Sequence, residues 1–422
     1  MNQPTHIQNH YPIATGDINI YHARLIADQQ VAYVLEFKDY LDLDRVQDSL
    51  DCLYATFPLL SCVLEKKGMN YQWAKMADFR PSFSLSDISP QGQAAFHEKI
   101  IQFISQPCDP ENQPPLKVYI LRTQDGDHLC FKVDHVLSDA GGLKFLLYLF
   151  AEAYRQGKIT QPINQNRSLR QIFRTFSLTT LVKAARHADV PRPGPALISG
   201  QFDSQPVFIE HACLDPRRFE QVRQVAKALG ATVNDFLLAA LYQVVFERLQ
   251  VDGNLYYPIM VPVDMRRYLP EEKRGVLGNL SSAVYPRLSK KPGEDFRGTL
   301  ARVKSVMDGN KQAAPGLGAA ILMTIGSMRG GRMLHDRYQI AARHGSRFIN
   351  LTNFGIIDEA ACNFGIIQPV QAYGVGPNQY APGILIAVST YRNCLHLVVQ
   401  GNDTRNFQPF VSEILGSLVS YF

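Results

Sequence analysis

The sequence predicts a mixed α/β (α+β) protein built from two halves of similar size. Its 422 residues exceed the length at which one core usually suffices, and 46% of them are hydrophobic. Strand-like alternation and helical spacing of apolar residues occur together on both sides of the middle of the chain. Between them, residues 156–205 lack strong apolar strands and contain Pro191-Arg-Pro-Gly-Pro195. We therefore expect one subdomain at 1–170, a crossover linker at 171–205 and a second subdomain at 206–422.

The elements of the first half follow from their periodicity and from the residues that interrupt it. Gln124-Asp-Gly-Asp127 marks a tight hairpin turn, because Asp-Gly supplies the positive φ values that such a turn needs. Residues 169–188 form a short basic stretch of helical pattern, which we place on the surface within the crossover. The other expected elements are helices at 44–57, at 93–105 and after Gly142, strands at 61–65 and 70–73, and a hairpin at 117–134.

The second half shows the same mixture of elements. Thr232 and Asp235 resemble a helix capping box in which Asp takes the place of the usual Glu. The broad apolar face that follows them indicates a core helix. The glycines at 316–318 and 328–332 match neither GxGxxG nor GxxxxGK followed by Ser or Thr, so we expect a flexible loop and no nucleotide site. The other expected elements are strands at 207–214, 257–263, 281–287, 348–353, 384–391 and 394–400, and a final helix at 408–419.

His135 and Asp139 stand four residues apart in the connection between a predicted strand and a predicted helix. Apolar residues alternate over 129–133 and recur at helical spacing over 143–150. A connection held between two rigid elements lets polar side chains face a cleft. An imidazole there accepts a proton near neutral pH, so His135 is a candidate general base. By local sequence alone, a structural histidine is an equally good interpretation.

The same spacing recurs at His211 and Asp215, which provide an internal comparison. Asp215 precedes Pro216 and a helical segment, which is the pattern of a helix N-cap with proline at the first helical position. His211 then lies within the preceding strand. We therefore interpret this second pair as structural.

Composition and charge exclude several classes of function. The net charge of +5 is modest and no long basic run occurs, so no nucleic-acid partner is expected. The first ten residues lack the pattern of a secretion signal, and no run of about eighteen apolar residues indicates a membrane span, so we expect a cytoplasmic protein. Seven scattered cysteines indicate reduced thiols, and neither HExxH nor CxxC spacing points to a metal.

A set of motifs occurs in a fixed order along nearly the whole chain. The motifs are Leu43 to Leu50, Phe57-Pro-Leu-Leu60, Pro114-Pro-Leu-Lys117, the His135 segment, Ala231 to Ala240, Val261-Pro-Val-Asp-Met-Arg266, Leu277-Gly-Asn279 and Leu351-Thr-Asn-Phe-Gly355. Together they resemble the condensation-domain and HxxxD acyltransferase superfamily. This superfamily includes chloramphenicol acetyltransferase-like enzymes, peptide-synthetase condensation domains and polyketide-associated acyltransferases.

Two residues depart from the usual HHxxxDG signature of that superfamily. Asp134 stands where several branches carry the first His, although the plant branch also lacks this His. Ala140 stands where a Gly is expected after the Asp. The candidate base at His135 is kept, and we expect Asp134 to support the site structurally.

The resemblance implies a V-shaped pseudodimer of two chloramphenicol acetyltransferase-like subdomains, with His135 midway along a channel between them. Segments around Gly355 and Gly376 would bridge the two halves. Asp139 would point away from the substrate and pair with Arg266, which braces the loop that carries His135. A buried carboxylate needs such a charged partner.

Further candidates follow from the later motifs. Thr352 and Asn353 are candidate donors to the oxyanion of a tetrahedral intermediate. Their alternative role is to form the turn at the end of a strand. Asn279 is a candidate oxyanion or channel residue.

The implied activity is transfer of an acyl group from a thioester to an alcohol or amine, with His135 removing the proton of the acceptor. No metal or tightly bound cofactor is expected; acyl-CoA or a phosphopantetheine-linked thioester would be the co-substrate. The expected partners are a small-molecule acceptor and an acyl or peptidyl carrier protein, and we expect a monomer. Two alternatives stay open: another base-assisted reaction, such as cyclisation of a carrier-bound intermediate, and a non-catalytic module that binds a carrier protein.

Overall fold

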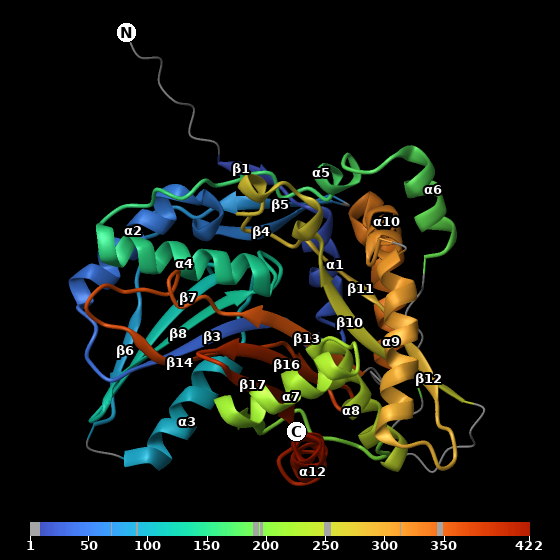
Figure 1. Ribbon diagram of the computed structural model, residues 1–422. Coiled ribbons are helices and arrows are strands. Elements are labelled where there is room, and N and C mark those ends of the chain that lie inside the picture. The colour runs from blue at the N-terminus through green and yellow to red at the C-terminus, as the bar shows by residue number, and fades with distance from the viewer. Residues whose placement is uncertain are drawn as a thin grey trace.

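The computed structural model describes residues 9–68, 70–89, 92–188, 194, 197–248, 255–312, 314–343 and 349–422. Helices and strands alternate along the chain and form two layered halves (Figure 1). Most of the proline-rich stretch at 191–195 lies outside the described residues, and so does residue 348, the expected start of a strand.

The first half is built on a five-stranded sheet with helices on both faces. Helices α2 (Leu43–Thr56) and α4 (Ala140–Gln156) cover one face, and α3 (Gly92–Ser105) lies on the other (Figure 1). Tyr33 and Phe131 belong to the buried core between the sheet and the first two of these helices. The strands, in spatial order, are β14 (Pro369–Val375), β3 (Gln30–Phe37), β8 (Gly126–Asp134), β7 (Leu116–Thr123) and β6 (Ser84–Asp87).

The second half is built on a seven-stranded sheet with its own core. Helices α7 (Pro216–Ala228) and α12 (Gln408–Ser420) pack on this sheet near one edge, α8 (Val233–Arg248) packs against both, and α9 (Phe296–Gln312) lies beside α8 (Figure 1). The strands, in spatial order, are β11 (Ser281–Val284), β10 (Tyr256–Asp264), β13 (Ile349–Ile356), β16 (Ile384–Tyr391), β17 (Cys394–Asn402) and β9 (Val207–Leu214), and β12 (Arg287–Ser289) also pairs with β10.

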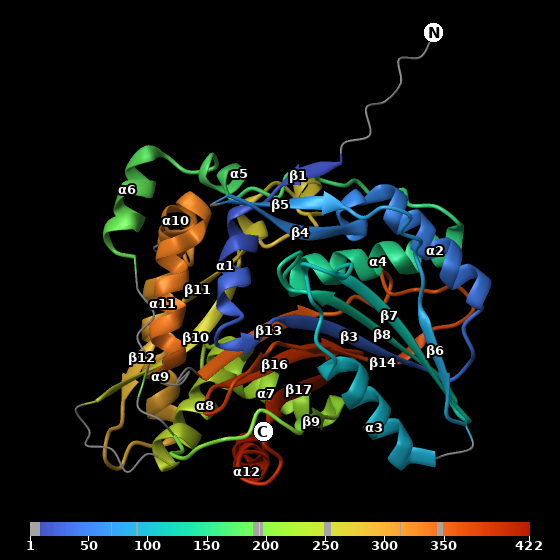
Figure 2. The same ribbon diagram turned by 180° about the vertical axis from the view of Figure 1, so that it is seen from behind.

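Helices from both ends of the sequence lie side by side. Helix α1 (Thr15–Ala23) packs against α10 (Leu317–Gly326) and α11 (Arg332–Arg343) (Figure 2). No single helix in the described ranges has the length and apolar composition to cross a membrane. Helices α7 and α8 have that length and composition only when taken together, and the chain bends by 97° between them. The remaining elements are the paired strands β2 (Ala27–Asp28) and β15 (Asn378–Gln379), the small sheet of β1 (His10–Pro12), β5 (Asn70–Lys75) and β4 (Cys62–Lys67), the helices α5 (Arg170–Phe173) and α6 (Leu178–Arg186), and the 3-10 helices η1 (Pro58–Ser61), η2 (Met265–Tyr268), η3 (Glu271–Lys273) and η4 (Met328–Gly331).

The second half of the sequence contributes a strand to the first sheet. After β13 the chain leaves the second sheet, and β14 pairs with β3 in antiparallel fashion, with Ala372 opposite Leu35. The chain then returns as β16 and pairs with β13. Residues 369–375 of the 206–422 segment therefore complete the sheet that carries the HxxxD motif.

Helix α4 fixes this crossover segment. Lys144 Nζ donates hydrogen bonds to the backbone oxygens of Phe354 and Ile356 at 2.7 and 3.1 Å. Arg155 donates to the backbone oxygen of Asn363 at 2.7 Å. The two halves are thus joined by polar contacts as well as by a shared strand.

Several of the expected elements have the expected bounds. The strands at 207–214 and 384–391 are confirmed, and so is the capping box, in which Thr232 Oγ1 accepts from Asp235 N at 3.1 Å. The single strand expected at 281–287 is wrong, because Pro286 lacks a backbone N–H and separates β11 from β12. The flexible loop expected at 316–318 and 328–332 is also wrong: Gly316, with φ of 82°, is the N-cap of α10, and 328–331 form η4.

Candidate active site

The HxxxD residues lie where β8 ends and α4 begins. His135 N donates to the backbone oxygen of Gln29 at 3.0 Å, which ties the start of the connection to the chain before β3. Asp139 is the N-cap of α4, and its Oδ1 accepts from Gly142 N at 2.9 Å. The helix therefore begins at Ala140, earlier than the sequence predicted, because Asp139 satisfies one of its first amides.

Asp139 forms an ion pair with Arg266, which lies in η2. Nη2 of Arg266 is 3.0 Å from Oδ1 of Asp139, and Nη1 is 3.1 Å from Oδ2. Both side chains are buried, and Leu280 N and Ser281 Oγ also donate to Oδ2 at 2.8 Å. Burial opposes ionisation, but Arg266 and these donors outweigh it and lower the pKa of Asp139. The ionised carboxylate therefore joins α4 to η2 and β11.

Asn279 reaches His135 from the second half of the sequence. Its Oδ1 lies 3.0 Å from Nδ1 of the imidazole. Its Nδ2 lies 2.9 Å from the backbone oxygens of His135 and Val136 and 3.0 Å from Oδ1 of Asp17. Because these three oxygens are acceptors, the amide nitrogen must face them and the amide oxygen must face the imidazole.

This orientation assigns the proton on the His135 ring. Asn279 Oδ1 only accepts, so Nδ1 of His135 carries the hydrogen and donates it. The ring also interacts with the backbone carbonyl of His135, which is another acceptor. Among the residues that the structure describes, none forms a hydrogen bond with Nε2. Nε2 thus keeps its lone pair, which a general base needs.

Burial keeps the His135 ring neutral near pH 7. It lowers the pKa of His135 below the ordinary value of 6.5, although the carboxylates of Asp139 and Asp17 oppose this shift. A histidine with a lowered pKa is unprotonated at neutral pH and is ready to accept a proton.

Asp134, which stands at the position of the first His, is a buried ion-pair partner. Its Oδ2 lies 2.7 Å from Nη1 of Arg24, and its Oδ1 accepts from Val136 N at 2.8 Å. Burial raises the pKa of Asp134 to about 6, although Arg24 opposes the shift. The side chain therefore ties α1 to the motif strand through Arg24, close to the C-terminal end of that helix.

The other predicted site residues do not join this cluster by hydrogen bonds. Thr352 is buried in β13 opposite Ala387, whereas Asn353 is exposed and its Oδ1 accepts from Gly355 N at 2.7 Å. In the described part of the chain, no hydrogen bond links either side chain to His135. Asn279, also considered as an oxyanion donor, has its amide hydrogens directed at three protein acceptors and holds the imidazole instead.

Asp17 and Arg167 also belong to this cluster and were not expected from the sequence. Asp17 is fully buried in α1, and Arg167 Nη2 donates to its Oδ1 at 3.0 Å and to the backbone oxygen of Leu137 at 2.6 Å. A Cβ on Gly16 would lie 2.5 Å from the backbone oxygen of Asn279, so this glycine permits the approach of α1. The available signal in the sequence is a glycine next to an aspartate in a weakly amphipathic segment, which matches no motif.

The second HxxxD pair lies elsewhere in the fold. Asp215 is the N-cap of α7 with Pro216 in the first turn, as expected, and His211 lies in β9. His211 Nε2 is 3.0 Å from His396 Nδ1, and its ring packs against Tyr373. Burial lowers the pKa of His211 to about 4.

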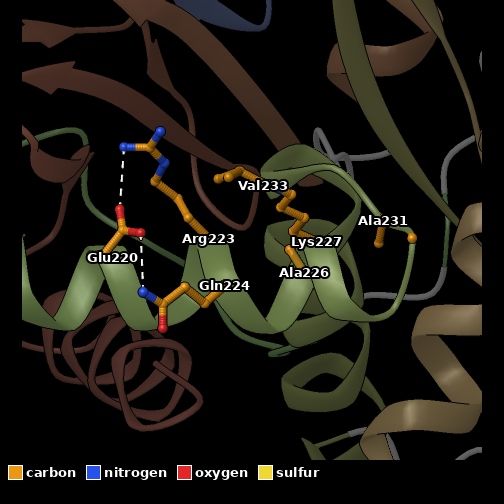
Figure 3. A pocket seen from close by; sticks show the side chains of 8 residues that line it. Glu220, Arg223, Gln224, Ala226, Lys227, Ala231 and Val233 are labelled. Atoms are coloured by element: carbon orange, nitrogen blue, oxygen red, sulfur yellow. Dashed lines mark hydrogen bonds and ion pairs between the residues drawn. The ribbon is translucent and has the colours of Figure 1, made fainter.

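A surface cavity is formed at the corner between α7 and α8. Its volume is about 620 Å³, and Glu220, Arg223, Lys227 and Val233 are among its lining residues (Figure 3). Glu220 forms an ion pair with Arg223 at 3.4 Å. None of the predicted site residues lines this cavity, so it is separate from the His135 cluster.

Comparison with solved structures identifies the fold. The first condensation domain of the calcium-dependent antibiotic synthetase matches with a TM-score of 0.72 and 15% identity over 100% of this chain and 96% of that chain. The epimerization domain from the third module of tyrocidine synthetase B matches with a TM-score of 0.66 and 15% identity, over 100% of this chain and 96% of that chain. The EpoB cyclization-docking bidomain from Sorangium cellulosum matches with a TM-score of 0.68 and 13% identity, over 98% of this chain and 84% of that chain.

These likenesses define a pseudodimer of two chloramphenicol acetyltransferase-like halves, as the resemblance implied. The profile of the Condensation domain family matches residues 28–314, and the chain belongs to this family. No curated protein matches the sequence. The members compared above include condensation, epimerization and cyclization domains, so membership alone leaves the reaction open.

Proposed function

We propose that the protein transfers an acyl group from a CoA or carrier-protein thioester to an alcohol or amine, with His135 as general base. The observation that carries this proposal is the hydrogen bond from Nδ1 of His135 to Oδ1 of Asn279. This bond leaves the lone pair of Nε2 free. The lowered pKa of His135 supports the same role, because the ring is neutral at the pH at which it must accept a proton.

The chemistry requires only one basic side chain. Nε2 takes the proton of the acceptor hydroxyl or amine while the acceptor oxygen or nitrogen attacks the thioester carbonyl. The tetrahedral intermediate then collapses, its C–S bond breaks, and the leaving thiolate takes the proton back from the imidazolium. No Ser or Cys nucleophile is needed, because a thiolate is a good leaving group. General-base assistance of this kind contributes a factor of about 10²–10⁴ in rate.

A screen for released thiol tests the proposal. Acyl-CoAs and carrier proteins loaded with acyl-phosphopantetheine are offered with pooled alcohols and amines, and free thiol is measured. We expect wild-type protein to release thiol with at least one donor and acceptor pair. His135→Ala should lower turnover by at least about 100-fold without lowering the melting temperature, as loss of a base requires.

His211→Ala is the matched control, because His211 has the same sequence spacing but lies in β9. It should leave turnover nearly unchanged. Equal losses in both variants at unchanged melting temperature would contradict the choice of His135. Binding of a carrier protein without thiol release for any acceptor would favour the non-catalytic module, and conversion of a carrier-bound intermediate without an acceptor would favour cyclisation.

A further inference from the structure

We propose that Asp17 is a positioning residue that acts on His135 through Asn279. The inference rests on the proposed role of His135 as base and deepens it. It is carried by a line of three buried or half-buried side chains: Asp17 Oδ1 accepts from Asn279 Nδ2 at 3.0 Å, and Asn279 Oδ1 accepts from His135 Nδ1 at 3.0 Å.

The surroundings of Asp17 fit an ionised carboxylate. Its Oδ1 accepts from Asn279 Nδ2 and from Arg167 Nη2, each at 3.0 Å. Its Oδ2 accepts from Trp73 Nε1 and from Ala14 N, each at 3.2 Å, and lies 2.9 Å from Arg167 Nη1. Every one of these groups is a donor, so a carboxylate, which only accepts, satisfies all of them. Burial raises the pKa of Asp17, and the charge of Arg167 and these hydrogen bonds oppose the shift.

Two physical effects connect Asp17 to the base. First, the carboxylate acts with the backbone oxygens of His135 and Val136 to hold the amide nitrogen of Asn279, so the amide oxygen faces the imidazole and keeps the hydrogen on Nδ1. Second, its negative charge favours the imidazolium that forms when Nε2 takes a proton, and it raises the pKa of His135 against the effect of burial. The orienting carboxylate of a catalytic triad performs both tasks by direct contact; here an amide lies between.

Asp17 also has a structural role, since it accepts from Ala14 N at the start of α1 and pairs with Arg167. A loss of stability in an Asp17 variant would therefore not distinguish positioning from packing. The pH profile of turnover and the pKa of the His135 ring do distinguish them, because neither changes when a folded protein merely becomes less stable.

Asp17→Asn is the first test variant. The new side chain carries no charge, and its amide nitrogen faces a donor in either orientation; only one of the two orientations keeps the contact with Asn279 Nδ2. With the acyl-CoA and acceptor that give the fastest thiol release, we expect kcat to fall roughly 10- to 100-fold with little change in KM. The acidic limb of the kcat profile should move to lower pH, because a negative charge that raises the pKa of His135 has been removed.

Gly16→Ala is the second variant, for the case in which Asp17→Asn does not fold. The new Cβ would meet the backbone oxygen and Cβ of Asn279 at 2.5 and 2.6 Å. It displaces α1 from Asn279 without changing any hydrogen-bonding group. We expect it to lower kcat in the same direction as Asp17→Asn.

Asp127→Asn is the matched control. Asp127 is fully buried, pairs with Arg122 at 2.9 Å and accepts from Leu41 N at 2.8 Å, but it lies at the start of β8, at the far end of that strand from His135. It should lower stability without moving the pH limb. A folded Asp17→Asn protein with kcat within twofold of wild type and an unmoved limb overturns the proposal.

NMR of the His135 ring provides a readout that does not depend on turnover. Protein with ¹⁵N-labelled histidine rings is compared with His135→Ala, which identifies the His135 signals. We expect a proton on Nδ1 both in wild type and in Asp17→Asn, because the backbone oxygens of His135 and Val136 still hold the Asn279 amide, and a lower ring pKa in Asp17→Asn. If His135→Ala retains full activity, the proposed base fails while this measurement still tests Asp17; an unchanged ring pKa in Asp17→Asn overturns the role of Asp17 alone.

Discussion

His135 and His211 show at the residue scale how the same spacing leads to different environments. His211 lies in the edge strand β9, where one of its ring nitrogens forms a hydrogen bond with His396 and its ring packs against Tyr373. Burial there lowers the pKa of His211 to about 4. His135 Nδ1 forms its hydrogen bond with the fixed side-chain amide of Asn279, and no described residue forms a hydrogen bond with Nε2. The difference lies in the partners, which come from distant segments and which spacing does not encode.

The lowered pKa of His135 predicts the pH dependence of turnover. A base must be neutral, and protonation removes activity as the pH falls through its pKa. Because burial places this pKa below 6.5, the midpoint of the acidic decline of kcat/KM should lie below pH 6.5. Thiol release measured across pH 4.5–8 checks this expectation, and an acidic limb centred above pH 6.5 would contradict it.

Asp134 requires a control in that experiment, since its pKa is raised to about 6 and it titrates in the same range. Asp134→Asn removes this titration while the amide oxygen can still accept from Val136 N. The acidic limb of a folded Asp134→Asn protein should keep its position. A limb that disappears in this variant would assign the pH dependence to the Asp134 and Arg24 pair instead of His135.

The motifs predicted three residues of the site, whereas the role of Asn279 and the presence of Asp17 could not be predicted from the sequence. His135, Asp139 and Arg266 stand in motifs, and the expected contact between the last two is present. Asn279 was selected for a different role, because sequence cannot show that its amide hydrogens already have acceptors. Asp17 was missed, because its contact with Asn279 joins residues at opposite ends of the chain and depends on a glycine that lets α1 approach.

At the scale of elements, the Asp139 and Arg266 pair predicts strong coupling between α4 and η2. Asp139→Ala leaves the buried guanidinium of Arg266 with only the half-exposed carboxylate of Asp264 as counter-charge, and should destabilise the protein by roughly 3–5 kcal/mol. The double variant with Arg266→Ala should cost less than the sum of the two single changes. Urea unfolding of the four proteins measures this coupling, and additivity within about 0.5 kcal/mol would mean that the ion pair contributes nothing.

Two elements near the site were not expected from sequence, for separate physical reasons. Residues 31–35 of strand β3 are buried and apolar on both faces, so they lack the alternation that marks a half-exposed strand. Helix α1 buries Gly16, Asp17 and His22, so it has no apolar stripe. Helix α2, which packs one apolar face, was predicted close to its bounds.

At the scale of the whole molecule, β14 should make the two halves unfold together. A Cβ on Gly374 would lie 2.1 Å from Cδ2 of Phe354, so Gly374→Ala forces a shift in the crossover and should cost about 1–3 kcal/mol. Trp73 is the single tryptophan and is buried in the first half. Its fluorescence and the far-UV circular dichroism should give the same lowered urea midpoint.

Gly416→Ala is the matched control, because a Cβ at this position of α12 meets nothing within 4 Å. Replacing a helical glycine with alanine should stabilise the protein by up to about 1 kcal/mol. If Gly374→Ala lowers the midpoint of Trp73 fluorescence while circular dichroism shows a second transition at the wild-type midpoint, the halves unfold independently and the shared strand does not couple them.

The shared strand also has a consequence for synthesis on the ribosome. Strand β3 is translated near the start of the chain, whereas its partner β14 is translated near the end. At about 5–20 residues per second, the nascent chain spends on the order of tens of seconds with one edge of β3 unpaired. Such an edge pairs readily with strands of other chains. We therefore expect the yield of soluble protein to depend on what covers this edge of β3 until residues 369–375 emerge.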